Sequence, residues 1–288
     1  MGGLIIFLAM MSSTLLWARL DNRFVILLIS SCSILWALGF TDDYLKCLEN
    51  RKDGLSAGVK MTGQLLLALS VAAYLYIDPP NISFITHLSV PYTKEAIWNI
   101  GFFYIPLCMI ILAGSSNSVN LTDGLDGLAS GTVIFAALTY AVFAYVAGNM
   151  KFADYLRIIP VAGAGELSVA LSAIVGSCLG FLWYNAYPAE IFMGDTGSLF
   201  LGGAIGLTAI CVKQELLLII VGGIYVAEAV SVLAQVYTFR IHNRRIFKMA
   251  PLHHHFELIG WPEPKVTIRF WIIGIVLALV ALASLKLR

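Results

Sequence analysis

The sequence has little charge for its length. Only 12% of its 288 residues are Asp, Glu, Lys or Arg, about half the share that is usual in soluble domains. The net charge of +1 shows no excess of basic residues of the kind that nucleic-acid-binding proteins use, so we expect no nucleic acid partner. The five cysteines are scattered and odd in number, which argues against a disulfide framework of the secreted type.

Apolar residues dominate instead. They make up 59% of the chain and gather in long runs between short polar gaps. A helix needs about 20 apolar residues to cross the hydrocarbon core of a bilayer, where only helices and closed barrels satisfy their backbone hydrogen bonds. We therefore predict an all-α polytopic transmembrane helical bundle, one domain over residues 1–288, surrounded by the lipid bilayer. The nine predicted spans are residues 3–19, 24–41, 61–78, 98–115, 128–148, 167–184, 198–212, 216–238 and 267–286.

Nine spans place the connecting segments alternately on the two sides of the membrane. One side receives 42–60, 116–127, 185–197 and 239–266, and with them ten carboxylates, against six on the other side. The two densest groups of basic residues also fall there. Since Lys and Arg are enriched in cytoplasmic segments, we assign this side to the cytoplasm. These basic residues are Lys46, Arg51, Lys52, Lys60, Arg240, Arg244, Arg245 and Lys248.

Two adjacent carboxylates, Asp42 and Asp43, stand where the second predicted span leaves the membrane. Neighbouring carboxylates repel each other unless a cation or hydrogen bonds compensate. A metal ion or a proton-transfer role explains the pair, and so does a solvated helix end at which water tolerates both charges.

A polar island at residues 117–131 separates two apolar runs. Its two aspartates are spaced i, i+3 and share a face if the island is helical. Its three glycines let a ligand or another backbone approach closely. A helix cap explains one aspartate but not the second one or the two asparagines. The island contains Asn117, Asn120, Asp123, Gly124, Leu125, Asp126, Gly127 and Gly131.

A third polar segment, residues 185–198, presents Asp195 between two glycines just before a predicted span. Helix N-termini favour phosphate, and an aspartate there can hold Mg²⁺. The alternative is that Asp195 only caps the helix. Phe192 either stacks on a base or anchors the chain at the membrane interface.

Three consecutive histidines follow at 253–255. They cannot all bind one metal from a helix, so contact of one or two of them with phosphate is the better interpretation, with a surface loop as the alternative. Glu228, Ser231 and Gln235 form a polar stripe in the predicted span 216–238. In a membrane such a stripe faces protein or a cavity, and Glu228 is equally well explained as a structural hydrogen-bonding group.

Together, these segments bring carboxylates, glycine-rich helix starts and basic residues to one membrane face. This combination suits Mg²⁺-dependent phosphoryl transfer, because the metal neutralises oxygen charge and the protein supplies positioning.

Residues 117–131, 185–198 and 251–266 closely resemble the bacterial phospho-N-acetylmuramoyl-pentapeptide transferases, a branch of the polyprenyl-phosphate N-acetylhexosamine-1-phosphate transferases. The likeness covers essentially the whole chain, and residues 252–263 look specific to this branch. It implies ten spans in the bacterial cytoplasmic (inner) membrane and an active site that faces the cytoplasm. We therefore expect the chain to lack the first helix of the family. The resemblance also allows a homodimer.

The resemblance implies that UDP-MurNAc-pentapeptide reacts with undecaprenyl phosphate to give lipid I and UMP, the first membrane step of peptidoglycan synthesis. It makes Asp195 the best Mg²⁺ ligand, with Asp42 and Asp43 nearby, and either of these two can take up a residual phosphate proton. Direct displacement is preferred to a phospho-aspartate on Asp42 or Asp43. For uridine it implies Asp123, Gly124, Leu125, Asp126, Phe192 and Gln235, and for pyrophosphate Lys46, Lys60, Asn185 and His253. Further substrate contacts are expected at Asn117, Asn120, His254 and His255.

Two other functions compete with this one. A transferase of the same superfamily that uses UDP-GlcNAc is disfavoured by the histidine-rich segment. A transporter of lipid-linked sugars is disfavoured because transporters place polar sites near the middle of the bilayer between repeats, whereas these clusters lie at one interface. A third possibility is a scaffold without activity.

Overall fold

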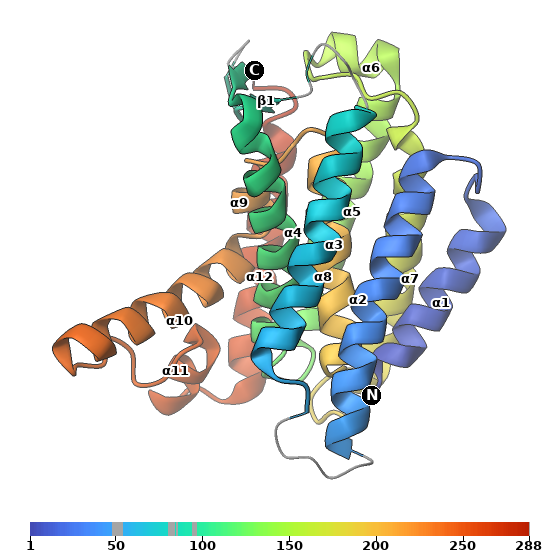
Figure 1. Cartoon of the computed structure of the whole chain (residues 1–288). Coiled ribbons are helices and arrows are strands. Elements are labelled where there is room, and N and C mark those ends of the chain that lie inside the picture. The colour runs from blue at the N-terminus through green and yellow to red at the C-terminus, as the bar shows by residue number, and fades with distance from the viewer. Residues whose placement is uncertain (48–53, 80–83, 85, 94–96, 288) are drawn as a thin grey trace.

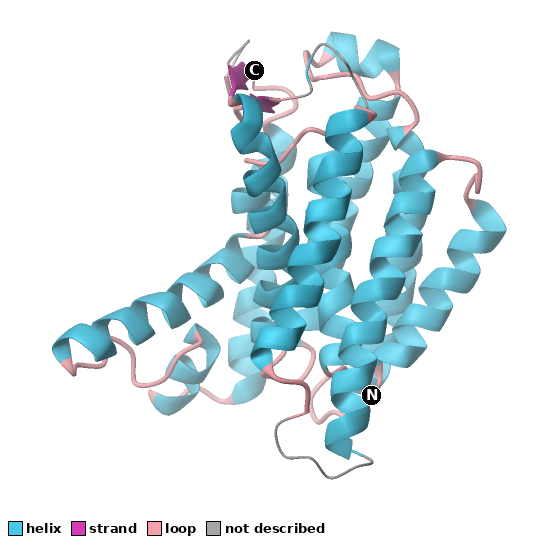
Figure 2. Cartoon of the chain, in the orientation of Figure 1, coloured by secondary structure: helices cyan, strands magenta, loops and turns pink. Residues whose placement is uncertain are grey.

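The computed structural model describes residues 1–47, 54–79, 84, 86–93 and 97–287. Within them the chain forms a bundle of nine long helices with short helical pieces and one antiparallel hairpin (Figure 1, Figure 2). The long helices are α1 (Gly3–Trp17), α2 (Arg23–Cys47), α3 (Ala57–Ile77), α4 (Tyr104–Thr122), α5 (Leu128–Gly148), α7 (Leu167–Asn185), α8 (Asp195–Cys211), α10 (Gly223–His242) and α12 (Glu263–Ala283). The shorter elements are β1 (His87–Ser89), β2 (Ile97–Asn99), η2 (Gly101–Phe103), α6 (Met150–Tyr155), η3 (Ala164–Glu166), α9 (Leu218–Val221) and α11 (Leu252–Leu258).

Each predicted span corresponds to one long helix, so the prediction of an all-α multi-pass membrane protein is confirmed. In the described part of the chain, seven helices are long and apolar enough to cross a membrane, whereas α1 and α8 have 15 and 17 residues. The predicted span 98–115 is displaced, because residues 97–99 and 101–103 form β2 and η2 and the helix α4 runs from Tyr104 to Thr122. The predicted span 216–238 also differs from the structure. It is divided at Gly222, where α9 ends and α10 begins, because two consecutive glycines weaken a helix.

Helix α8 lies at the centre of the bundle. Every residue from Thr196 to Cys211 is buried, and the helix packs against α2 and α4. Small residues allow this close packing: a Cβ added to Gly202 would stand 2.4 Å from the carbonyl oxygen of Ser115. The N-terminus of α8, where Asp195 stands, is therefore fixed by the core.

The polar segments gather at the two ends of the bundle. Figure 1 shows the N-terminus, the end of α2 and α11 at one end, and the hairpin, α6 and the C-terminus at the other. The segments predicted to share a side therefore lie at the same end. Of the basic residues named above, Arg51 and Lys52 lie outside the described residues. Helix α10 leaves the bundle beside α11 (Figure 1) and exposes large apolar side chains such as Leu233 and Tyr237.

A buried ion pair stands at the end of α8 that is far from Asp195. Lys213 Nζ lies 3.2 Å from Glu215 Oε1, and both side chains are at most 2% exposed. The Tyr104 hydroxyl donates to the same carboxylate oxygen at 2.6 Å, and Lys213 Nζ lies 3.9 Å from the centre of the Tyr104 ring. Since buried charges are tolerated only when they are paired, this cluster ties the turn after α8 to α4.

Candidate active site

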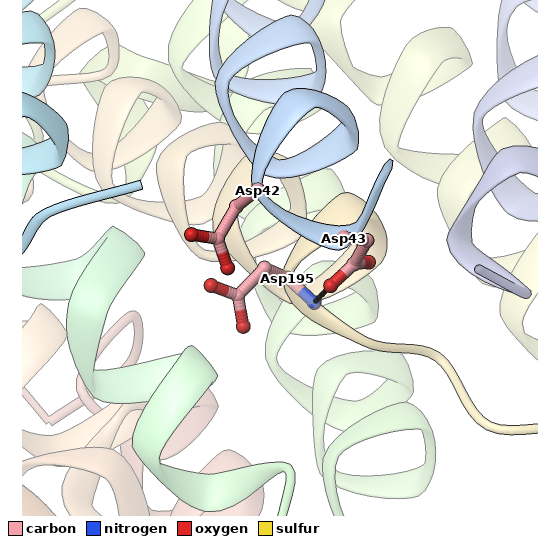
Figure 3. A group of neighbouring side chains, drawn as sticks. All are labelled: Asp42, Asp43 and Asp195. Carbon is pink, nitrogen blue, oxygen red and sulfur yellow. Dashed lines mark hydrogen bonds between the residues drawn. The ribbon is translucent and has the colours of Figure 1, made fainter. Parts of the chain in front are cut away.

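Three carboxylates from two helices meet at the polar end of the bundle. Asp42 and Asp43 lie near the end of α2, and Asp195 is the first residue of α8. One oxygen from each lies within 4.8 Å of the others. Figure 3 shows the carboxylates of Asp42 and Asp195 facing each other, while Asp43 turns toward the backbone nitrogen of Asp195. The structure thus brings together the three residues that were predicted as metal ligands.

Two lysines balance this cluster. Lys46 lies one helical turn after Asp42, and its Nζ is 2.5 Å from Asp42 Oδ2. Lys60, on α3, places its Nζ 2.9 Å from Asp195 Oδ2 and 3.3 Å from Asp42 Oδ1. Three carboxylates therefore face two ammonium groups, which leaves the cluster acidic and still able to attract a cation. The same lysines can also contact an anionic phosphate once a cation shares the carboxylates.

Asp43 already has several hydrogen-bond donors. Its Oδ2 accepts the backbone N–H of Thr196 at 3.0 Å and the Thr196 hydroxyl at 2.6 Å, and its Oδ1 accepts the backbone N–H of Asp195 at 3.3 Å. These N–H groups belong to the first turn of α8, which lacks partners within the helix. Asp43 therefore caps α8 from a neighbouring helix and fixes the backbone of Asp195.

We expect Asp43→Asn to lower the free energy of unfolding by about 2 kcal/mol. The amide keeps the shape, but it loses the charge that favours a helix N-terminus and turns one acceptor into a donor. Thermal unfolding in detergent measures the change. Thr196→Val keeps both backbone donors and should cost about half as much, and an Asp43→Asn protein as stable as the wild type would contradict the cap.

Asn120 and two glycines also surround Asp195. The Asn120 amide donates to Asp195 Oδ1 at 2.8 Å and to the Ser198 hydroxyl at 2.9 Å. Gly194 has φ +72°, and a Cβ there would stand 2.5 Å from Asp43 Oδ2. A Cβ on Gly39 would stand 2.1 Å from the carbonyl oxygen of Asp195. Only glycine fits at both positions, so these two residues permit the close approach of α2 and α8.

Asp123 stands beside this cluster and directly follows Thr122, the last residue of α4. Burial raises its pKa to about 7, the nearby carboxylates of Asp195 and Asp43 raise it further, and a hydrogen bond from the Gly194 backbone opposes them. The charge of Asp123 is therefore expected to change near neutral pH. Gly124, next to it, is exposed, whereas Leu125 is buried in a small apolar cluster with Leu128 and Val266.

Several predicted substrate-binding residues hold the protein's own backbone. Asp126 Oδ2 accepts the backbone N–H of Ala189 at 2.9 Å, and the Asn185 amide donates to the carbonyl of Ile191 at 2.9 Å. Gln235 Oε1 accepts the N–H groups of residues 246 and 247. Asn117 donates to Gln64 at 2.7 Å. These residues shape the loops around the site, and their contact with a substrate stays a prediction.

The three histidines differ in their surroundings. His253 is buried, and its Nδ1 lies 3.2 Å from Glu228 Oε1. His254 Nδ1 lies 2.8 Å from Glu257 Oε2, and His255 Nδ1 accepts the backbone N–H of Lys248 at 3.1 Å. Phe192, on the loop before Asp195, is 66% exposed, so its ring is free to stack on a ligand.

Two further residues contact the site, although the sequence did not assign them to it. Ser198 shares the amide of Asn120 with Asp195, and Glu228 touches the start of α11 and His253. The polar stripe on α10 singled out Glu228, but no sequence signal connected it to the histidines 25 positions later.

Comparison with known proteins places the chain in a family. The sequence model of glycosyl transferase family 4 matches residues 24–213, a range that contains all three clustered aspartates. The phospho-N-acetylmuramoyl-pentapeptide-transferase of Endomicrobium trichonymphae is 53% identical over 288 residues, which are 100% of this chain and 80% of the relative. Proteins of the same name from Leptospira biflexa and Thermodesulfovibrio yellowstonii are 52% and 51% identical, with the same shares covered. The chain therefore belongs to glycosyl transferase family 4 and, within it, to the phospho-N-acetylmuramoyl-pentapeptide-transferases.

Proposed function

We propose that the protein transfers phospho-MurNAc-pentapeptide from UDP-MurNAc-pentapeptide to undecaprenyl phosphate, giving lipid I and UMP, in the cytoplasmic membrane of a bacterium. The observation that carries the proposal is the cluster of three carboxylates and two lysines at the polar end of the bundle, in a chain that is 51–53% identical to transferases of this name. The basic residues at this end support a site that faces the cytoplasm.

The residues present fit Mg²⁺. Asp42 and Asp195 offer carboxylate oxygens, the ligands that Mg²⁺ prefers, and Mg²⁺ is commonly held by one or two carboxylates together with substrate phosphates. Asp43 is held by three donors, so we assign it to orienting Asp195. When bound, the ion would neutralise charge on the phosphate oxygens during transfer.

The chain's own residues suit a direct displacement. The attacking phosphate of the lipid is already anionic, so a strong base is unnecessary. Lys46 and Lys60 supply positive charge for the pyrophosphate. A phospho-aspartate would require an unoccupied carboxylate oxygen, yet Asp42 is bound by two lysines and Asp43 by α8. This occupancy supports attack by the lipid phosphate on the nucleotide pyrophosphate without an intermediate on the enzyme.

An apolar groove supports a lipid substrate. A hollow of about 540 Å³ between α3, α4 and α10 is lined by residues such as Met61, Met109 and Leu233. Asn117 and Leu121, in the last two turns of α4 before Asp123, also line it. An isoprenoid chain gains free energy by burial against such surfaces. We infer that the chain of a lipid phosphate bound at the acidic cluster follows this groove, because Met61, next to Lys60 in the sequence, is among its lining residues.

The donor nucleotide distinguishes the competing functions. With Mg²⁺ and undecaprenyl phosphate present, we expect UMP release from UDP-MurNAc-pentapeptide and turnover of UDP-GlcNAc at least about 10³-fold slower, because a site built for polar groups rejects a substrate that lacks them. Equal turnover of the two would favour the UDP-GlcNAc transferase. Transport of a lipid-linked sugar without UMP release would favour the transporter.

Asp123→Ala should separate nucleotide binding from metal binding. Loss of an acceptor for the uracil is expected to raise the dissociation constant of the UDP-sugar about 10- to 100-fold, with a much smaller change in Mg²⁺ affinity. Titrations with each ligand measure both, and Asp154→Ala, an exposed aspartate at the opposite end, is the control. An equal loss of affinity for the UDP-sugar and for Mg²⁺ would contradict the assignment of Asp123 to nucleotide binding.

Uridine binding should depend on pH through Asp123. Because the pKa of Asp123 is raised to about 7, its carboxyl gains charge as the pH rises from about 6 to 8 in the metal-free protein, and the charged form is the better acceptor for the uracil N–H. Calorimetry with uridine, which has no phosphate to titrate, should show affinity that rises over this window and is level in Asp123→Asn. Wild-type affinity that stays level or falls would count against the uracil contact.

A further inference from the structure

Glu228 is a fully buried carboxylate that the reaction outlined above does not use. It lies inside α10 with 0% exposure. A buried carboxylate is stable only when other groups compensate its charge or its hydrogen-bonding capacity. Among the described residues, its side-chain partners belong to α11: Oε2 accepts the N–H of Leu252 at 2.6 Å, and Oε1 accepts the N–H of His253 at 3.3 Å and lies 3.2 Å from His253 Nδ1.

The imidazole of His253 is held between this carboxylate and the turn that carries Asp123. Its side chain is 1% exposed. Within the described residues neither ring nitrogen has a well-aligned hydrogen-bond partner, but Nδ1 is 3.2 Å from Glu228 Oε1, whereas Nε2 has no polar side chain paired with it. A Cβ added to Gly124 would stand 2.3 Å from Nε2. Gly124 has no side chain, so its backbone lies directly against Nε2. Gly124 itself is exposed to solvent.

A buried nitrogen without a partner, next to the turn proposed to bind the nucleotide, indicates a partner that arrives with the ligand. With Glu228 at Nδ1, Nε2 is the ring nitrogen that remains for that ligand. A carboxylate that accepts from one ring nitrogen of a histidine fixes both the orientation and the proton position of the ring.

We propose that Glu228 is a positioning residue for the transfer: it holds the His253 ring so that Nε2 meets a phosphate oxygen of the nucleotide substrate at the Asp123–Gly124 turn. The inference rests on the proposed transferase function and adds a residue to it. The backbone N–H groups of α11 need only an acceptor, which Gln also supplies, so the specific part of the role is the pairing with the imidazole.

A double-mutant cycle on kcat tests this pairing. We expect His253→Ala to lower kcat about 10²-fold, Glu228→Gln about 10-fold, and the double variant no more than His253→Ala alone within about threefold, with little change in KM for the nucleotide. Ser231→Ala, which removes a buried hydroxyl that donates to the Glu228 carbonyl, should retain wild-type kcat. Losses that multiply to about 10³-fold, or a Glu228→Gln protein with wild-type kcat, would overturn the proposal.

Nitrogen NMR of histidine-labelled wild-type protein provides a test that needs no Glu228 variant. The resonances of His253, identified by their loss in His253→Ala, should show a protonated Nδ1, and an unprotonated Nδ1 would overturn the proposal. This measurement tests the pairing of Glu228 with His253 whether or not turnover is observed. If the wild type and Ser231→Ala both fail to release UMP while Nδ1 is protonated, the proposed transferase function is wrong, whereas the contact between Glu228 and His253 is confirmed.

Discussion

Asp195→Asn is expected to lower kcat about 10³-fold, which corresponds to about 4 kcal/mol of lost transition-state stabilisation. Asp195 faces Asp42 (Figure 3), receives Lys60 Nζ at 2.9 Å and Asn120 at 2.8 Å, and begins the most buried helix of the bundle. The amide has nearly the same shape and keeps one oxygen, so the loss reports the charge. Mg²⁺ affinity should fall together with kcat.

The control for this variant is Asp154→Asn, the same chemical change on α6 at the far end of the bundle. It should leave kcat and Mg²⁺ affinity unchanged. Asp195→Asn should also unfold at a temperature close to that of the wild type, because its backbone stays capped by Asp43. Full activity of Asp195→Asn would remove Asp195 from the metal site.

Lys213→Met is expected to lower the free energy of unfolding by about 3–5 kcal/mol, because it leaves the Glu215 carboxylate buried without its counter-charge. The side chains of this pair are at most 2% exposed, so water cannot replace the missing partner. The double variant Lys213→Met/Glu215→Gln removes both charges and should recover at least half of the loss. Thermal and denaturant unfolding in detergent measure the three proteins.

Lys286→Met is the matched control, since Lys286 is exposed and its Nζ contacts the Tyr155 hydroxyl. Its stability should stay within about 0.5 kcal/mol of the wild type. If the double variant were less stable than Lys213→Met, the carboxylate would have another compensating partner and the ion-pair interpretation would be wrong.

Hydropathy predicted where the helices lie in the sequence, but it did not predict how they tilt relative to one another. Every predicted span overlaps one long helix, because long apolar runs leave the backbone no other way to satisfy its hydrogen bonds in lipid. The break at Gly222 and the departure of α10 from the bundle were not predicted. Span length does not determine tilt, which depends on packing against neighbouring helices.

At the site, the sequence identified Asp42, Asp43 and Asp195 but could not separate their roles. Both members of the adjacent pair looked like metal ligands, yet one faces Asp195 and the other caps α8. Adjacent residues on a helix point about 100° apart, so they meet different neighbours. Gln235 is predicted as a nucleotide contact by family resemblance, and this stays a prediction; the structure adds that its side chain holds the backbone of residues 246 and 247. Such roles depend on loops whose paths no local pattern encodes.

The most direct test of the account is a product balance with the purified protein in detergent or bilayers. With UDP-MurNAc-pentapeptide, undecaprenyl phosphate and Mg²⁺ present, UMP and the lipid-linked product should appear in equal amounts. Omission of either the lipid phosphate or the Mg²⁺ should abolish both products. UMP release that continues without undecaprenyl phosphate, or lipid product formed at an unchanged rate after chelation of Mg²⁺, would contradict a metal-assisted transfer at the Asp42–Asp195 cluster.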